Sequence, residues 1–227
     1  MSYIISPPEE TALQAHLHKL RTQLHEDPEL SWQEHRTTRL VRQELDPLGL
    51  PTGTAALLRG ALPGPTVGLR ADLDALPITE RTGAEFSSRV PGVMHACGHD
   101  AHASILMAVA ETLAHHRELV HGTVYFVFEQ GEEFLPGGAQ QLVKDGIMDH
   151  IDYMFAWHAA ALEKVGTVDI AAGVREAAVG TYDLKITGKG GHGGFPHKAN
   201  NPVIPAAELV SAINLIPALK CDPLENC

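Results

Sequence analysis

The chain has 227 residues, of which 44% are hydrophobic and 20% are charged, an ordinary composition for a globular protein with a substantial core. Its formal net charge of −11, with no cluster of lysines or arginines, argues against a nucleic-acid partner. No apolar run approaches the roughly 20 residues that a membrane span requires, so no membrane partner is expected. Residues 1–10 do not resemble a secretory signal and the three cysteines form no disulfide framework, so we expect a reducing, cytoplasmic location.

The N-terminal third predicts two helices followed by two strands. Ser6, with a proline next and Glu9 three residues on, is typical of a helix start with a capping box. Leucines then recur at helical spacing and predict one buried stripe: Leu13, Leu17, Leu20 and Leu24. A second helix is expected over residues 33–48. Two strands are expected over residues 55–59 and 67–71, separated by a turn at residues 63–65.

Helices and strands alternate in the middle of the chain. A helix is expected to begin near Ala101, and another to run from Gly137 to about Gly146. Short apolar or β-branched runs predict further strands over residues 123–128, 153–157 and 165–171, the first two of them buried. This alternation predicts an α/β fold in which helices flank a mixed, mostly parallel sheet.

The sequence changes in character after about residue 175. Residues 181–187 alternate as a strand, a glycine-rich stretch follows, and a helix is expected over residues 202–216. We therefore divide the chain into a first domain over residues 1–175 and the first part of an α+β domain over residues 176–227. A strand–helix pair is too small to form a well-covered domain by itself.

Polar residues follow the carboxyl ends of three predicted strands. They are Asp72 and Asp74 after the first, Glu132 and Glu133 after the second, and His158 after the third. In open α/β sheets this edge is where ligands bind. We therefore expect these separate segments to meet at one site.

Residues 95–102 hold one thiol, three imidazoles and a carboxylate, which are the side chains that bind transition metals. If this segment is extended, Cys97 and His99 point to the same side, and Gly98 lets the backbone approach a metal closely. The alternative is an inert buried cysteine beside a packed histidine. The neighbouring Asp100 and His102, and the polar groups at the same sheet edge, favour the metal site.

The other polar groups also have simpler interpretations. Glu132 and Glu133 could form an exposed acidic pair, but metal-dependent hydrolysis needs one carboxylate on the metal and one that moves a proton. Because adjacent side chains point apart, the pair could divide these tasks. Asp72 and Asp74 are either turn residues or partners that orient a ligand histidine. His158 alone would be a core histidine, and its place at the sheet edge makes it a candidate ligand.

Four stretches of the chain carry a resemblance to a known family: residues 70–78, 94–102, 131–139 and 188–202. Together they resemble the M20 family of metallopeptidases and aminoacylases, in particular its branch of hippurate hydrolases, auxin-conjugate hydrolases and N-acetyl-diaminopimelate deacetylases. The resemblance covers roughly residues 10–225 and implies a hydrolase-like catalytic domain followed by a lid or dimerisation domain.

The resemblance also implies individual roles. The ligands of two divalent metal ions would be Cys97, His99, Glu133 and His158, with Cys97 bridging. This mixed ligand set does not decide between zinc, manganese, cobalt and nickel. Glu132 would be the general base, Asp72 and Asp74 would support the ligands, and His192 would be the lid histidine that reaches into the active site of a partner subunit.

Two features depart from the family pattern. Phe128 is followed by Glu129 and Gln130, where family members commonly have Gln-Pro-Ala, so an additional carboxylate is expected near the catalytic pair. The chain is also much shorter than family members. We therefore expect it to end inside the lid domain, without the last metal-binding histidine.

The sequence thus predicts a metal-dependent hydrolase that cleaves the amide bond of N-acyl amino acids and acts as a homodimer or larger homo-oligomer. Two alternatives stay open: a truncated, catalytically inactive fragment of such an enzyme, and a cysteine hydrolase that uses Cys97 with His99. Chelation would distinguish the cysteine hydrolase, which needs no metal.

Overall fold

The computed structural model describes residues 5–50, 55–170, 172–173 and 180–220. The chain divides into two compact units, Met1–Glu163 and Lys164–Cys227, and each is described here by itself. The domain boundary expected near residue 175 falls among residues 174–179, which lie outside the described residues.

The first unit is built on a four-stranded sheet with the strand order β1-β3-β2-β4. The strands are β1 (Ala55–Arg59), β2 (Leu62–Asp72), β3 (His121–Glu129) and β4 (Tyr153–Ala156). β2 pairs in parallel with both β3 and β4, whereas the edge strand β1 runs antiparallel to β3. The predicted mixed, mostly parallel α/β sheet is confirmed.

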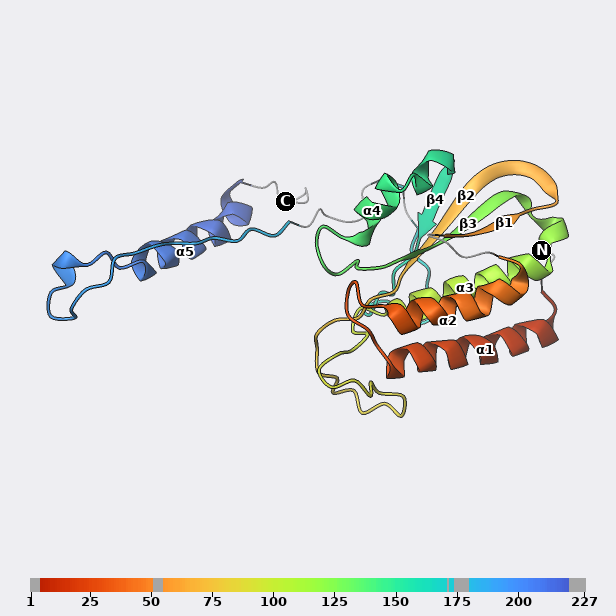
Figure 1. Cartoon of the computed structure of the whole chain (residues 1–227), viewed down its shortest axis with the longest axis horizontal. Coiled ribbons are helices and arrows are strands. Elements are labelled where there is room, and N and C mark those ends of the chain that lie inside the picture. The colour runs from red at the N-terminus through yellow and green to blue at the C-terminus, as the bar shows by residue number, and fades with distance from the viewer. Residues whose placement is uncertain (1–4, 51–54, 171, 174–179, 221–227) are drawn as a thin grey trace. The chain divides into compact units, whose positions relative to one another are not determined.

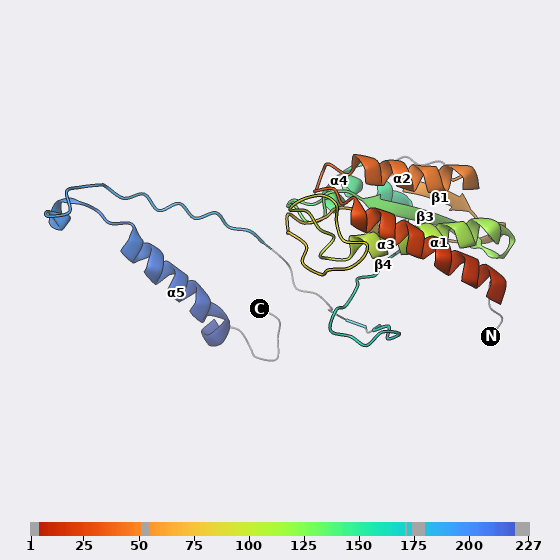
Figure 2. The same cartoon turned by 90° about the horizontal axis from the view of Figure 1, so that it is seen from below.

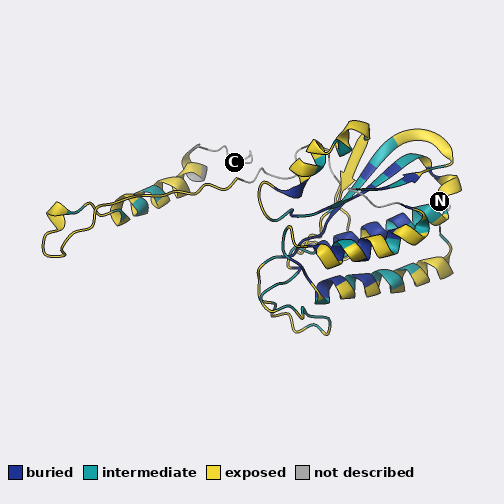
Figure 3. Ribbon diagram, in the orientation of Figure 1, coloured by how far each residue is buried: buried dark blue, intermediate teal, exposed yellow. Residues whose placement is uncertain are grey.

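Helices cover the two faces of the sheet unequally. Figures 1 and 2 show α1 (Pro7–Glu26), α2 (His35–Leu45) and α3 (His99–His115) stacked on one side, with α4 (Gly138–Lys144) on the other. The apolar core lies on the first side, where Leu20, Leu106 and Phe126 are at most 2% exposed. Figure 3 shows the buried residues gathered between these helices and the sheet. Short 3-10 helices complete the unit: η1 (Asp46–Leu48), η2 (Arg117–Leu119) and η3 (Ile147–His150).

Local sequence signals explain the helix ends. The backbone N–H of Ser6 donates a hydrogen bond to Glu9 Oε2 at 2.7 Å, which completes the predicted capping box of α1. The leucine stripe of α1 becomes more buried along the helix and is fully buried at Leu20 and Leu24. The 3-10 helix η1, which follows α2 directly, ends where Gly49 adopts a left-handed φ of 68°, a conformation that glycine reaches without strain.

Three local expectations for residues 55–170 are wrong. β2 begins at Leu62 and runs through the turn expected at residues 63–65, because its pairing with β3 resumes after an irregularity between Leu62 and Thr66. β4 is exposed along its whole length, unlike the other edge strand β1, in which Ala56 and Leu58 are buried. The stretch from Val165 to Ile170 forms no strand, and Ala171 lies outside the described residues.

The second unit holds η4 (Pro196–Lys198) and α5 (Val203–Lys220), which confirms the predicted helix and extends it at its end. The strand expected over residues 181–187 is not formed, because a strand needs a partner for its backbone groups. In the described part of this unit the pairing is a single bridge between Lys189 and Asn200. Among the described residues, no helix is long and apolar enough to cross a membrane.

Candidate metal centre

The parallel register brings the ends of three strands to one edge of the sheet. The last residues of β2 and β3, Asp72 and Glu129, are paired with each other, and β4 lies along the other side of β2. The loops that follow these strands carry Asp74, the pair Glu132-Glu133, and His158. The polar groups that were predicted to follow separate strands therefore lie next to one another at this edge of the sheet.

Gly98 turns the chain into α3 and sets the positions of its neighbours. It is the N-cap residue of the helix, and its φ of 90° lies in the left-handed region. Contrary to the expectation, Cys97 and His99 therefore do not lie in an extended segment. Cys97 lies just before the first helical turn, and His99 lies within it. They still meet at one point: Cys97 Sγ is 3.3 Å from His158 Nε2, and donor atoms of all three residues lie within 4.8 Å of one another.

Both members of the glutamate pair approach the same imidazole. His99 Nε2 lies 3.7 Å from Glu133 Oε1 and 3.9 Å from Glu132 Oε2, so the two side chains converge instead of pointing apart. Glu132 is the more accessible, with its side chain 39% exposed against 21% for Glu133. Burial and the adjacent Glu133 carboxylate raise the pKa of Glu132, the direction that suits a group which takes up a proton.

The donor atoms at this edge fit a divalent cation. Nε2 of His99 and Oε1 of Glu133 are buried and have no hydrogen-bond partner among the described residues, an arrangement that is costly without a ligand. Burial, together with the Glu133 carboxylate beside it, raises the pKa of the Cys97 thiol to about 12. A cation between these groups would compensate the negative charge and favour the thiolate.

Asp72 holds two histidines of α3. Its Oδ1 accepts a hydrogen bond from His102 Nδ1 at 2.7 Å, and its Oδ2 lies 3.5 Å from His99 Nε2. His102 Nε2 in turn accepts the backbone N–H of Ala159 at 2.9 Å, which assigns the imidazole proton to Nδ1. His102 therefore holds the loop next to His158. The sequence assigned His102 no role of its own, although its spacing of three from His99 places both on one helix face.

Asp74 connects the loop after β2 to the loop that carries the glutamate pair. Its Oδ2 accepts hydrogen bonds from Ser31 Oγ at 2.6 Å and from the backbone N–H of Glu133 at 2.9 Å, and its Oδ1 lies 3.3 Å from His99 Nδ1. Burial alone would raise the pKa of Asp74, but these partners lower it to about 2. Asp74 is therefore a carboxylate at neutral pH that faces the ring nitrogen of a candidate ligand.

The sequence matches peptidase family M20/M25/M40 over residues 68–218, more than half of the chain. The chain belongs to peptidase family M20/M25/M40.

Relatives in this family align with nearly the whole chain. The N-acyl-L-amino acid amidohydrolase of Geobacillus stearothermophilus is 39% identical over 212 residues, which are 90% of this chain and 57% of the relative. Thermostable carboxypeptidase 1 of Saccharolobus solfataricus is 38% identical over 216 residues, which are 91% of this chain and 55% of the relative. The chain thus spans about half the length of these curated relatives.

A solved structure of the M20 family has a similar fold. The YXEP protein of Bacillus subtilis, described as a dinuclear metal binding peptidase, is 36% identical in sequence and superposes with a TM-score of 0.69. The superposition covers 72% of this chain and 48% of that one.

The unusual Glu129 of this M20 chain does not add a free carboxylate to the site. Arg70, which the sequence analysis missed, donates to Glu129 Oε2 at 2.6 Å and to Asp72 Oδ2 at 2.7 Å. The other oxygen of Glu129 accepts the backbone N–H of Ala139 at 2.6 Å. Arg70 therefore neutralises Glu129 and helps to fix the carboxylate of Asp72.

His192 lies in the second unit, where its side chain is exposed. Its Nδ1 accepts the backbone N–H of Gly194 at 3.0 Å, and its ring centroid lies 5.4 Å from that of Phe195. Its action at an active site stays a prediction.

Proposed function

We propose that this chain carries the metal centre and the general base of a metal-dependent hydrolase that cleaves the amide bond of N-acyl amino acids, a class that includes hippurate and N-acetyl amino acids. The observation that supports this most directly is the convergence of sulfur, nitrogen and oxygen donors on His99, whose buried Nε2 has no hydrogen-bond partner among the described residues. The names of the 35–39% identical amidohydrolase and deacetylase relatives support the substrate class.

In this proposal, two divalent ions are held by Cys97, His99, Glu133 and His158, with zinc, manganese, cobalt and nickel all compatible with the donors. When bound, such ions polarise the substrate carbonyl and lower the pKa of water. Asp72 and Asp74 orient the ligands through the contacts described above.

The proton steps fall to Glu132. It is accessible and its pKa is raised, so it can take a proton from the attacking water and pass it to the departing amine. In a homodimer, His192 of a second copy would stabilise the negative charge that develops on the carbonyl oxygen.

A second candidate is a catalytically inactive fragment of such an enzyme. The observation behind this candidate is the coverage, since the chain spans 57% of the amidohydrolase relative. A cysteine hydrolase is disfavoured, because burial and the nearby Glu133 carboxylate keep the Cys97 thiol protonated, and the thiol is a poor nucleophile.

The decisive experiment combines metal analysis with hydrolysis of a panel of N-acetyl and N-benzoyl amino acids by the 227-residue protein, before and after chelation. We expect Glu132→Gln to keep the wild-type metal content and to lose turnover by roughly 100-fold or more, as for removal of a general base. Glu85→Gln, at an exposed position away from the centre, is the matched control. Hydrolysis that is lost on chelation would support the hydrolase. Absence of turnover, with weak metal binding or none, would support the inactive fragment and refute the hydrolase.

A further inference from the structure

The loop that carries the glutamate pair is held from outside by a segment far away in the sequence. We call residues Gln130–Glu133 the glutamate loop and residues Ser31–Thr38 the support segment. The two are connected by a hydrogen bond between residues 97 positions apart, in which Glu34 Oε1 accepts the backbone N–H of Gly131 at 2.7 Å. No side chain of the support segment is among the donor groups of the metal centre in the described residues.

Trp32 lies flat against the backbone of Gly131. A Cβ atom built on Gly131 would lie only 2.4 Å from Cε2 of the Trp32 indole, a contact that real Cβ atoms do not make. Gly131 also has a φ of 68°, where a side chain would be strained. Glycine at this position therefore lets the indole contact the loop backbone directly.

The backbone of Trp32 is itself strained. Its φ of 65° makes it the one non-glycine residue with positive φ in the described part of the chain, and bulky residues rarely adopt this conformation. Burial does not explain the strain, because Trp32 is 45% exposed. What the conformation provides is the contact with Gly131, and such local strain is typical of functional sites.

Glu34 provides the second contact and is fully buried, at 0% exposure. Its second carboxyl oxygen, Oε2, has no hydrogen-bond partner among the described residues. Burying a carboxyl group with one unpartnered oxygen lowers the free energy of unfolding, so stability alone does not explain the position of Glu34. The group reaches the glutamate loop one residue before Glu132.

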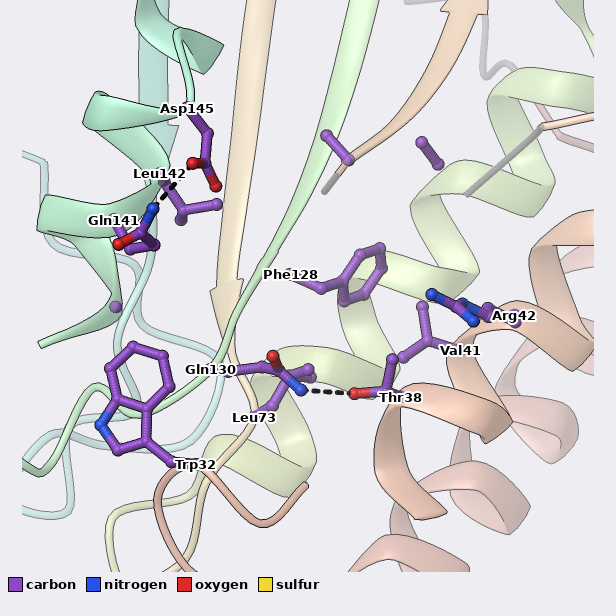
Figure 4. A pocket seen from close by; sticks show the side chains of 13 residues that line it. Trp32, Thr38, Val41, Arg42, Leu73, Phe128, Gln130, Gln141, Leu142 and Asp145 are labelled. Carbon is purple, nitrogen blue, oxygen red and sulfur yellow. Dashed lines mark hydrogen bonds between the residues drawn. The ribbon is translucent and has the colours of Figure 1, made fainter. Parts of the chain in front are cut away.

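Further contacts fix the two ends of the glutamate loop. Gln130 Nε2 donates to Thr38 Oγ1 at 2.8 Å. Figure 4 shows this pair, with Trp32, at the wall of a cavity of about 180 Å³ whose lining includes residues of α2 and α4. At the other end, Ser31 Oγ and the backbone N–H of Glu133 both donate to Asp74 Oδ2. The support segment thus reaches the start, the middle and, through Asp74, the end of the loop.

We infer that the support segment positions the glutamate loop, with Trp32 and Glu34 as positioning residues that place Glu132 and Glu133 beside His99. The inference rests on the proposed function for the roles of that pair. It predicts that loosening the support segment weakens metal binding through Glu133 without removing any ligand.

Amide hydrogen exchange tests the contact in the metal-free protein. Glu34→Ala removes the acceptor of the Gly131 N–H, so exchange at Gly131 should become at least about tenfold faster. Glu34→Gln keeps a carbonyl oxygen in the same place and should restore slow exchange.

Cobalt titration, followed through the visible absorption of Co²⁺ bound to the Cys97 thiolate, tests the consequence for the metal centre. Glu34→Ala and Trp32→Asn should each weaken Co²⁺ binding by about tenfold or more, as expected for loss of an outer partner, and should alter the absorption bands. Asparagine tolerates positive φ, and Trp32 is half exposed, so Trp32→Asn should fold normally.

The control for lost stability alone is Leu58, a fully buried leucine of the apolar core. It lies in β1, outside both the support segment and the glutamate loop. Leu58→Ala should lower the Tm but leave the Co²⁺ affinity of the folded protein within about twofold.

The inference is overturned if Trp32→Asn and Glu34→Ala fold and keep wild-type exchange and Co²⁺ affinity, or if Leu58→Ala weakens Co²⁺ binding equally. If Glu34→Ala does not fold, Trp32→Asn decides. If the wild-type chain binds no Co²⁺, the proposed function fails, and exchange at Gly131 still decides whether the support segment holds the loop.

Discussion

The helical layer of the first unit and the carboxyl edge of its sheet are equally buried, but they bury opposite kinds of side chain. In the helical layer, Leu45 and Leu106 are fully buried and apolar. At the edge, Asp72, Asp74 and His99 are each 1% exposed, and all can carry charge. Apolar burial stabilises a fold, whereas burial of charged groups costs stability unless they are paired. The apolar helical layer therefore supplies the stability that maintains the charged carboxyl edge of the sheet.

The largest difference in metal affinity between substitutions in the two regions is expected for His99→Ala. His99 belongs to every group of candidate metal donors among the described residues, so its removal should weaken metal binding by more than roughly 100-fold, beyond the effect of losing an outer partner. Because the imidazole lies between the buried carboxylates of Asp72 and Asp74, its removal should also lower the free energy of unfolding of the metal-free protein, and zinc affinity is therefore compared per folded molecule. Isothermal titration with zinc measures the first, and His18→Ala, at an exposed position of α1, is the control. Unchanged zinc affinity would remove His99 from the centre.

The opposite result is expected in the helical layer. Leu106→Ala should lower the free energy of unfolding by about 2–5 kcal/mol, because it leaves a cavity in the core. The zinc bound per folded molecule should not change. Urea denaturation measures the loss, and Leu119→Ala, at a residue that is 55% exposed, should cost far less. Equal effects of the two substitutions would contradict the assignment of the core.

A smaller effect is expected for Asp74→Asn, which keeps the size of the side chain and removes its charge. The amide cannot compensate the charge of a cation beside His99, and we expect metal affinity to fall by about 10–100-fold. Competition with a coloured chelator measures this change. Asp152→Asn, at an exposed aspartate before β4, should leave the affinity unchanged.

The smallest effect is a pH dependence of stability at His25, which lies between the two regions. The hydrogen bond from His25 Nδ1 to Asp100 at 2.8 Å, and the contact with Glu80, raise the pKa of His25 above its usual 6.5. The protonated form therefore stabilises the fold fully below pH 6.5, and this contribution is lost as the pH rises through the raised pKa. In chelator, the urea midpoint of the wild type should fall above pH 6.5 more than that of His25→Gln. Parallel pH profiles would contradict this.

The sequence was sufficient to predict which loops meet, because the carboxyl ends of parallel strands lie at one edge in any α/β sheet. Asp72, the glutamate pair and His158 were found in this way. The local geometry was less predictable. Gly98 begins a helix instead of continuing a strand, and this depends on a left-handed φ that glycine permits but does not dictate.

The contacts that cross the fold were missed for a different reason. His102 could have been found from its helical spacing to His99, but Arg70 and Glu34 act through hydrogen bonds to residues that are distant in the sequence. The strand expected over residues 181–187 failed because alternation predicts which face is apolar, not whether a partner strand is present.

Both tryptophans of the chain adjoin the loops that carry the candidate ligands. Trp32 contacts Gly131, and Trp157 directly precedes His158. The tryptophan fluorescence of the protein therefore originates next to the candidate ions, and paramagnetic Co²⁺ or Ni²⁺ should quench it. An optical signal of ion loading is thus already built into the unlabelled molecule.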